Sequence, residues 1–100
     1  MEYVSMLILG ILLCGLGVLN LKGNISLIHR YNRRRVREED VPAYGKAVGI
    51  GHVIIGSSFA LCFFLSFVSE LILPFVIVPS IAAGLGFILY AQFKYNGGLF

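Results

Sequence analysis

Charged side chains are scarce in this sequence. Of its 100 residues, 13% are Asp, Glu, Lys or Arg, about half of the quarter that is usual in soluble domains. They are also unevenly placed, because seven of the eight Lys and Arg residues lie between Lys22 and Lys46. This pattern excludes an ordinary soluble globule, a disordered chain and a nucleic-acid-binding domain with a basic face. No nucleic acid is therefore expected among its partners, and the length predicts a single domain over residues 1–100.

The sequence also lacks the short motifs that mark common enzymes. It contains no HExxH, GxSxG, GKS/T or CxxC motif, and GxG pairs such as Gly15-Leu-Gly17 and Gly49-Ile-Gly51 lack the third glycine of a dinucleotide-binding loop. Its two cysteines, Cys14 and Cys62, lie in separate apolar runs and predict neither a disulfide framework nor a zinc site. We therefore expect a non-enzymatic protein with no catalytic residues, no metal site and no cofactor.

What the sequence has instead is long runs without charge. Residues 3–21 carry none, and as a helix they would reach about 28 Å, close to the roughly 30 Å hydrocarbon core of a bilayer. A cleaved signal peptide is the competing interpretation. It needs a basic start and a small-residue cleavage site, whereas this run follows Glu2 and ends in Leu-Asn-Leu-Lys. A retained helix is therefore favoured.

A second, almost uncharged stretch is too long for one crossing. Residues 47–93 contain one formal charge, Glu70, and would form a helix of about 70 Å. The chain must therefore turn back near Glu70, which predicts a second span over 47–68 and a third over 71–93. Pro74 suits the first turn of the third helix. The second helix is expected to begin near Asp40, because an acidic residue complements the helix dipole there.

These spans define the predicted fold class. Backbone groups in hydrocarbon must bond to one another, so uninterrupted apolar runs of this length indicate helices rather than the alternating strands of a barrel. We predict an all-α integral membrane protein with three transmembrane helices and a basic, amphipathic loop over residues 22–46. Loops rich in Lys and Arg stay in the cytoplasm. The chain is therefore expected to be a multi-pass protein of the cell (inner) membrane, with its N-terminus outside and its loop and C-terminus in the cytoplasm.

The basic loop holds the first candidate site. Ile25, Ile28 and Tyr31 recur at steps of three, which predicts a short amphipathic helix lying along the inner membrane surface. The arginines of this segment are candidates for binding an anionic lipid headgroup or an acidic partner: Arg30, Arg33, Arg34, Arg35 and Arg37. The alternative is a topology signal with nonspecific adhesion. The acidic residues that follow are also candidates to pair with the cluster in place of a ligand.

Small residues and one histidine share a face of the second helix. Gly45, Gly49 and Gly56 recur at helical spacing, and Gly84 has a similar setting in the third span. Such residues allow close helix approach in lipid, either within the chain, which is favoured, or between copies in a homo-oligomer. His52 lies on the same face. An intramembrane ionisable residue is a functional candidate, although a structural hydrogen bond is the favoured role here.

Residues 15–56 carry a family resemblance. The segments Ser26-Leu-Ile-His-Arg-Tyr-Asn, Glu38-Glu39 and Ala43-Tyr-Gly-Lys46 with Gly49 resemble a group of small prokaryotic membrane proteins whose function is uncharacterised. That resemblance implies three spans rather than an activity. A more distant similarity is to SdpI-like immunity proteins, which protect bacteria from a secreted toxin. Their loop carries Arg-Thr-Pro where this chain has Arg33-Arg34-Arg35.

Two classes of function follow from these observations. The leading hypothesis is a protein that acts by association with lipid, with itself or with a larger membrane partner, in an accessory or immunity-like role. The rival is a small transporter or channel that forms only as an oligomer, because three short spans enclose no pore. The chain resembles the small multidrug exporters in size, but those have four spans and a Glu in the first, where this chain has no carboxylate.

Overall fold

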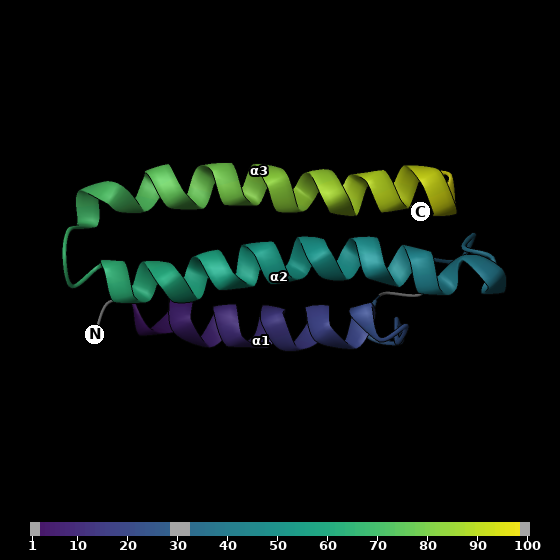
Figure 1. The fold of residues 1–100 in the computed structure, drawn as a ribbon, viewed down its shortest axis with the longest axis horizontal. Coiled ribbons are helices and arrows are strands. Elements are labelled where there is room, and N and C mark those ends of the chain that lie inside the picture. The colour runs from purple at the N-terminus through teal and green to yellow at the C-terminus, as the bar shows by residue number, and fades with distance from the viewer. Residues whose placement is uncertain (1–2, 29–32, 99–100) are drawn as a thin grey trace.

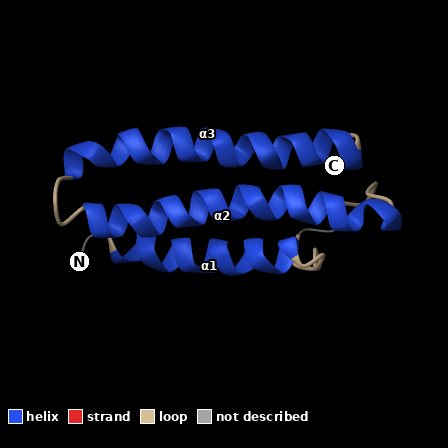
Figure 2. Ribbon diagram, viewed as in Figure 1, coloured by secondary structure: helices blue, strands red, loops and turns tan. Residues whose placement is uncertain are grey.

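The computed structural model describes residues 3–28 and 33–98. The predicted all-α architecture is confirmed: the described residues form three long helices and contain no strand (Figure 2). All three helices are long and apolar enough to cross a membrane, so the chain has the character of a multi-pass integral membrane protein. The helices are α1 (Val4–Leu21), α2 (Val41–Leu65) and α3 (Leu73–Ala91). Single turns of 3-10 helix at Glu38–Asp40 and Glu70–Ile72 precede α2 and α3, and a π-helical turn at Gln92–Asn96 follows α3.

The middle helix, α2, holds the other two in place (Figure 1). The bundle measures 45 × 20 × 18 Å, and its two ends differ. The turn between α2 and α3 lies at the end where α1 begins, whereas the α1–α2 loop and the end of α3 lie together at the other. The outer helices pack on opposite faces of α2 rather than on each other.

Large apolar side chains cover the outside of the bundle. Ile11 and Leu12 of α1, Phe64 of α2, and Phe75 and Val78 of α3 are all exposed by more than half. Soluble proteins rarely expose apolar surface on this scale, whereas lipid tails solvate it readily. The exposed faces of the helices therefore have the character of lipid-facing surface.

Local sequence explains where the first helix stops. Gly23 has a positive φ of 91°, which a residue with a side chain adopts only at a cost. The Gly23 N–H donates to Asn20 O at 2.9 Å and the Asn24 N–H donates to Leu19 O at 3.0 Å. This pair of bonds is a Schellman motif, which satisfies the last carbonyls of α1. The loop therefore begins where the sequence predicts it, just after residue 21.

The second helix ends earlier than the predicted span. It stops at Leu65, and Phe67 and Val68 lie in the turn instead of in the helix. The Ser69 side chain accepts from the Leu71 N–H at 3.2 Å, which fixes the start of the next helical turn. Pro74 lies in the first turn of α3, where its missing N–H leaves no bond unmade.

Candidate functional site at the basic end of the bundle

The α1–α2 loop folds onto the end of the bundle. Ile25 is buried against Tyr44 and Val48 of α2 and Ala91 of α3, and Val36 packs beside them. The prediction of an amphipathic helix through this segment is wrong for the described part. Residues 24–28 and 33–37 form turns and extended backbone, and residues 29–32 lie outside the described residues.

Two physical causes account for that difference. The Asn24 side chain accepts hydrogen bonds from the Ser26 N–H at 3.0 Å and the Ser26 hydroxyl at 2.7 Å, a local pattern that competes with helix formation. In addition, Ile25 is buried against the ends of α2 and α3, and Ile28 and Val36 pack beside it. The spacing of Ile25 and Ile28 therefore reflects their contacts with the ends of α2 and α3, not the period of a helix on the membrane surface.

The arginine segment is tied to the C-terminal turn. The Arg35 N–H donates to Asn96 Oδ1 at 2.7 Å, and Asn96 Nδ2 donates to Gly98 O at 2.9 Å. The Asn96 side chain is 1% exposed, so this connection is shielded from solvent. Within the loop, Arg33 Nε donates to Ile28 O at 2.9 Å. These bonds hold the loop and the end of α3 together as one surface.

The predicted arginines consequently differ in role. Arg33 is half-buried and engaged with loop backbone, whereas Arg34, Arg35 and Arg37 have exposed side chains. Arg37 forms an exposed ion pair with Glu39, with 3.5 Å between nitrogen and oxygen; pairs of this kind contribute little to stability. The fifth predicted arginine, Arg30, lies outside the described residues.

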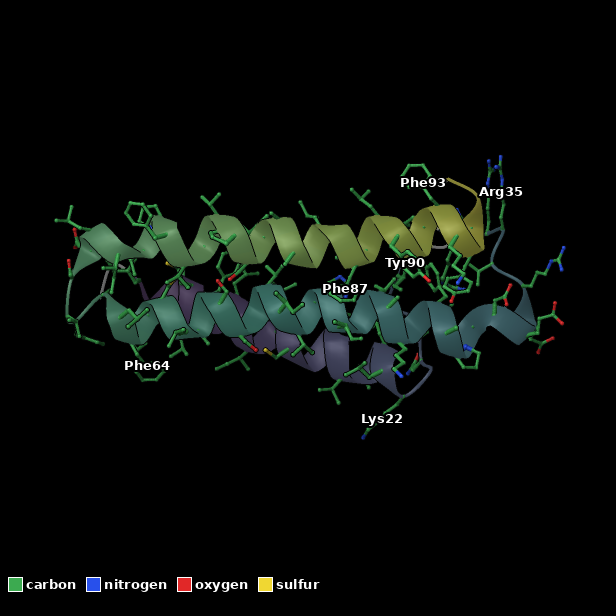
Figure 3. The ribbon with its side chains drawn as sticks, turned by 45° about the horizontal axis from the view of Figure 1, so that its top comes forward. Lys22, Arg35, Phe64, Phe87, Tyr90 and Phe93 are labelled. Carbon is green, nitrogen blue, oxygen red and sulfur yellow. The ribbon has the colours of Figure 1, made fainter. Side chains whose placement is uncertain are left out.

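Other cations join the arginines at this end. Figure 3 shows Lys22, at the end of α1, and Arg35 on the same end of the bundle. Lys46 lies near the start of α2, next to Gly45 at the level of Asn20, and Lys94 lies in the π-helical turn. We call this set the basic end: Lys22, Arg33, Arg34, Arg35, Arg37, Lys46 and Lys94. In the part of the chain that the structure describes, no Lys or Arg lies outside this set, and Glu70 is at the opposite end.

His52 faces α1 and joins a partly buried polar network. Its Nδ1 lies 2.9 Å from Asn20 Oδ1, and Asn20 Nδ2 donates to Asn24 O at 3.0 Å. Because a carbonyl can only accept, the Asn20 amide has its nitrogen toward Asn24 and its oxygen toward His52. His52 therefore carries its proton on Nδ1. The geometry gives His52 a hydrogen-bonding role between α1 and α2 at the start of the loop.

The predicted glycines lie where the helices meet. A Cβ atom added at Gly49 would be 2.6 Å from Gly17 O, and one at Gly56 would be 2.7 Å from Gly10 O. A Cβ at Gly45 would be 2.5 Å from Asn20 O, again on the α1 side. Gly84 serves the other interface, where an added Cβ would lie 2.4 Å from Ile55 Cγ1. In this structure all four glycines pack against a neighbouring helix of the same chain.

Three buried polar residues at the basic end were not predicted from the sequence. The Tyr44 hydroxyl donates to Gln92 Oε1 between α2 and the π-helical turn, and Gln92 Nε2 donates to Gly98 O at 3.3 Å. Tyr44, Gln92 and Asn96 are each at most 5% exposed. The sequence did offer one indication of this site, which is an amide side chain near the end of an apolar span. Such a side chain must find hydrogen-bond partners when it is buried.

The remaining candidates are the metal-ligating side chains and the two thiols. In residues 3–28 and 33–98, no three His, Cys, Asp or Glu side chains come together in a metal-binding group. The two thiols are far apart in the chain: Cys14 Sγ lies 3.9 Å from Val53 O, and Cys62 Sγ lies 4.0 Å from Leu73 O. Comparisons with protein-family models, curated proteins and solved structures found no match to this chain.

Proposed function

We propose that this chain is a non-enzymatic membrane protein that acts by association, with its basic end docked on the anionic headgroups of the cytoplasmic leaflet. One observation carries the proposal: the described Lys and Arg residues gather at one end of three apolar helices. Each such cation near an anionic leaflet is worth about 1 kcal/mol. The membrane in question is the cell (inner) membrane, with the basic end inside and the α2–α3 turn outside.

The geometry favours association over transport by a single chain. The outer helices pack on opposite faces of α2, and the buried polar pairs Asn20–His52 and Tyr44–Gln92 both lie near the basic end rather than along a path across the bundle. The partner is lipid, a second copy or a larger membrane protein, in an accessory or immunity-like role. Flux of an ion or cationic dye through liposomes containing the purified protein would contradict this proposal and favour the oligomeric transporter.

The orientation can be tested with single cysteines. In a background with Cys14→Ala and Cys62→Ala, we expect Glu70→Cys to react with a membrane-impermeant maleimide in intact spheroplasts. Ser26→Cys, in the loop, is expected to react only after the membrane is permeabilised, because the cation-rich loop stays in the cytoplasm. Both positions are exposed in the structure, so accessibility to the reagent is set by the membrane. The reverse labelling pattern would show the proposed orientation to be wrong.

The headgroup contacts can be tested by removing exposed arginines. With Leu27→Trp as a reporter on the exposed side of the loop, brominated anionic lipid is expected to quench the Trp fluorescence more strongly than brominated zwitterionic lipid. The combined variant Arg34→Gln, Arg35→Gln and Arg37→Gln should lower this preference by about fivefold for each arginine that contacts a headgroup. Glu39→Gln is the matched control, since it removes a charge of the opposite sign. Unchanged quenching in the arginine variant would contradict headgroup docking.

A further inference from the structure

A groove opens between α2 and α3 at the basic end. Its volume is about 230 Å³, and its walls come from Lys46, Ala47 and Ile50 on one side and from Phe87 and Tyr90 on the other. A second hollow of about 390 Å³ lies along α3, lined by Ala83, Gly86, Phe87 and Tyr90. The two hollows share Phe87 and Tyr90 and therefore adjoin one another. Figure 3 shows these two aromatic residues on the half of α3 nearer the basic end.

Contacts between the helices fix the depth of this groove in the membrane. Gly45 lies against Asn20 O at the end of α1, so Lys46 is level with the end of a span. Gly51 lies against Gly84 and Ile88 of α3, so the part of the groove near Ile50 is about one turn deeper. The groove therefore begins at headgroup level and continues into the hydrocarbon region.

The shallow part of the groove is cationic and aromatic. Lys94 Nζ donates to the Tyr90 hydroxyl at 2.9 Å and lies 5.3 Å from the Tyr90 ring centroid and 5.4 Å from that of Tyr95. Tyr90, Tyr95 and Lys46 line the groove, and Lys94 adjoins it through its contacts with these two tyrosines. Over the described ranges, the ion pair that forms is Arg37–Glu39, so neither lysine has a carboxylate within salt-bridge distance there. Both positive charges are therefore available to a bound anion.

We propose that this groove binds one anionic phospholipid from the leaflet that faces the basic end. The phosphate lies between Lys46 and Lys94, within reach of the tyrosine hydroxyls. One acyl chain follows Ala47, Ile50 and Phe87, and the other occupies the hollow beside Gly86. Basic pockets between membrane helices are suited to such headgroups. A second copy in the same orientation would bring its own lysines to the same depth, so like-charge repulsion favours lipid as the occupant. The inference rests on the orientation given under the proposed function.

The test counts lipids retained by the whole chain. The protein is reconstituted in nanodiscs made of equal amounts of phosphatidylglycerol and phosphatidylcholine with identical acyl chains, then released gently and weighed by native mass spectrometry. The wild type is expected to retain one phosphatidylglycerol in preference to phosphatidylcholine. Lys46→Gln with Lys94→Gln should reduce that retention by about thirtyfold, or about fivefold for each cation. Lys22→Gln removes one cation of the basic end on α1, outside the groove, and should lower retention by no more than about fivefold.

A second variant tests the acyl chain independently of charge. Gly86→Leu places a side chain in the hollow, where nothing lies within 4 Å of an added Cβ. It is expected to weaken retention by about fourfold for each CH₂ group of the lipid that it displaces. An effect of the lysine pair equal to that of Lys22→Gln, or an unchanged affinity in Gly86→Leu, would overturn the proposal. So would displacement of the lipid by millimolar inorganic phosphate, because a bare anion site needs no acyl chain.

The outcome also separates this inference from the proposed function. If the lysine pair behaves as the Lys22 control while the arginine variant loses its preference for anionic lipid, the groove assignment fails alone. If the cysteine labelling shows the basic end outside, both the proposed orientation and the groove assignment that rests on it are wrong.

Discussion

Adding one methyl group at each of Gly49 and Gly56 is expected to destabilise the bundle by about 2–6 kcal/mol, the summed cost of two overpacked sites. The reason is geometric. Each new Cβ would meet a carbonyl oxygen of α1, at 2.6 Å for Gly49 and 2.7 Å for Gly56, where the backbone cannot move without separating the helices. Unfolding of the purified protein by increasing SDS in mixed micelles measures the effect, with Gly49→Ala, Gly56→Ala and the double variant compared.

The chain offers matched controls for this experiment. Gly15 in α1 and Gly86 in α3 have nothing within 4 Å of an added Cβ. Gly15→Ala and Gly86→Ala should leave stability unchanged or raise it by up to about 1 kcal/mol, because Ala is the better helix former. The sign of the change therefore reports whether a glycine is packed.

The same variants decide between packing within the chain and packing between copies. If Gly49 and Gly56 pack on α1 of their own chain, the native mass in nanodiscs should stay the same while stability falls. If they pack against another copy, the double variant should instead lower the native mass and leave unfolding of the single chain unaffected. The latter outcome would contradict the structure described above.

Much of the fold follows directly from hydrophobic length. Two uncharged runs, one of them too long for a single crossing, require three helices with a turn near Glu70. Pro74 and Asp40 mark helix starts, because proline and acidic residues suit the first turn. The end of α2 at Leu65 was harder to predict from the sequence, because Phe67 and Val68 are as apolar as the helix they follow. Hydropathy cannot distinguish a turn from a helix within an apolar run.

The loop shows where periodicity fails. Ile25 and Ile28 are spaced like residues on one face of a helix. The same spacing also occurs in a loop whose two side chains contact one protein surface, as they do here. What decides the conformation is tertiary contact with Tyr44, Val48 and Ala91, and these residues are distant in sequence. The turn at Asn24 and the hydrogen bond from the Arg35 N–H to Asn96 also favour this loop conformation over a helix. Local pattern alone therefore could not reveal that the arginine segment belongs to the same surface as the end of α3.

The groove could not be predicted from the sequence for a similar reason. Lys46 and Lys94 are 48 positions apart in the chain, and only the packing of α2 and α3 brings Lys46 to one groove with Tyr90 and Tyr95, the two tyrosines that Lys94 contacts. In the sequence each appears as an isolated charge at the end of an apolar run, which is common in membrane proteins. The glycines and His52 were easier to identify, because a shared helix face can be read from spacing within a single element.

Replacing Asn20 by Ala is expected to cost about 2 kcal/mol of stability. Asn20 has no exposed surface, and its side chain bonds both His52 Nδ1 at 2.9 Å and Asn24 O at 3.0 Å. Hydrogen bonds between membrane helices contribute about 0.6–1.7 kcal/mol each, and the substitution leaves buried groups without partners. Asn24→Ala is the comparison, because it keeps the backbone carbonyl that Asn20 uses and removes only the exposed bonds to Ser26. It should change stability by less than about 1 kcal/mol.

A double-mutant cycle then tests whether His52 works through Asn20. If the role of His52 is to bridge α1 and α2, His52→Ala should cost about 1 kcal/mol alone and add little in the Asn20→Ala background, which gives a coupling energy of about 1 kcal/mol. Additive effects of the two substitutions would show that His52 has a partner other than Asn20. In that case the tautomer deduced from the Asn20 amide would lose its basis, and a functional role for the ring within the membrane would regain support.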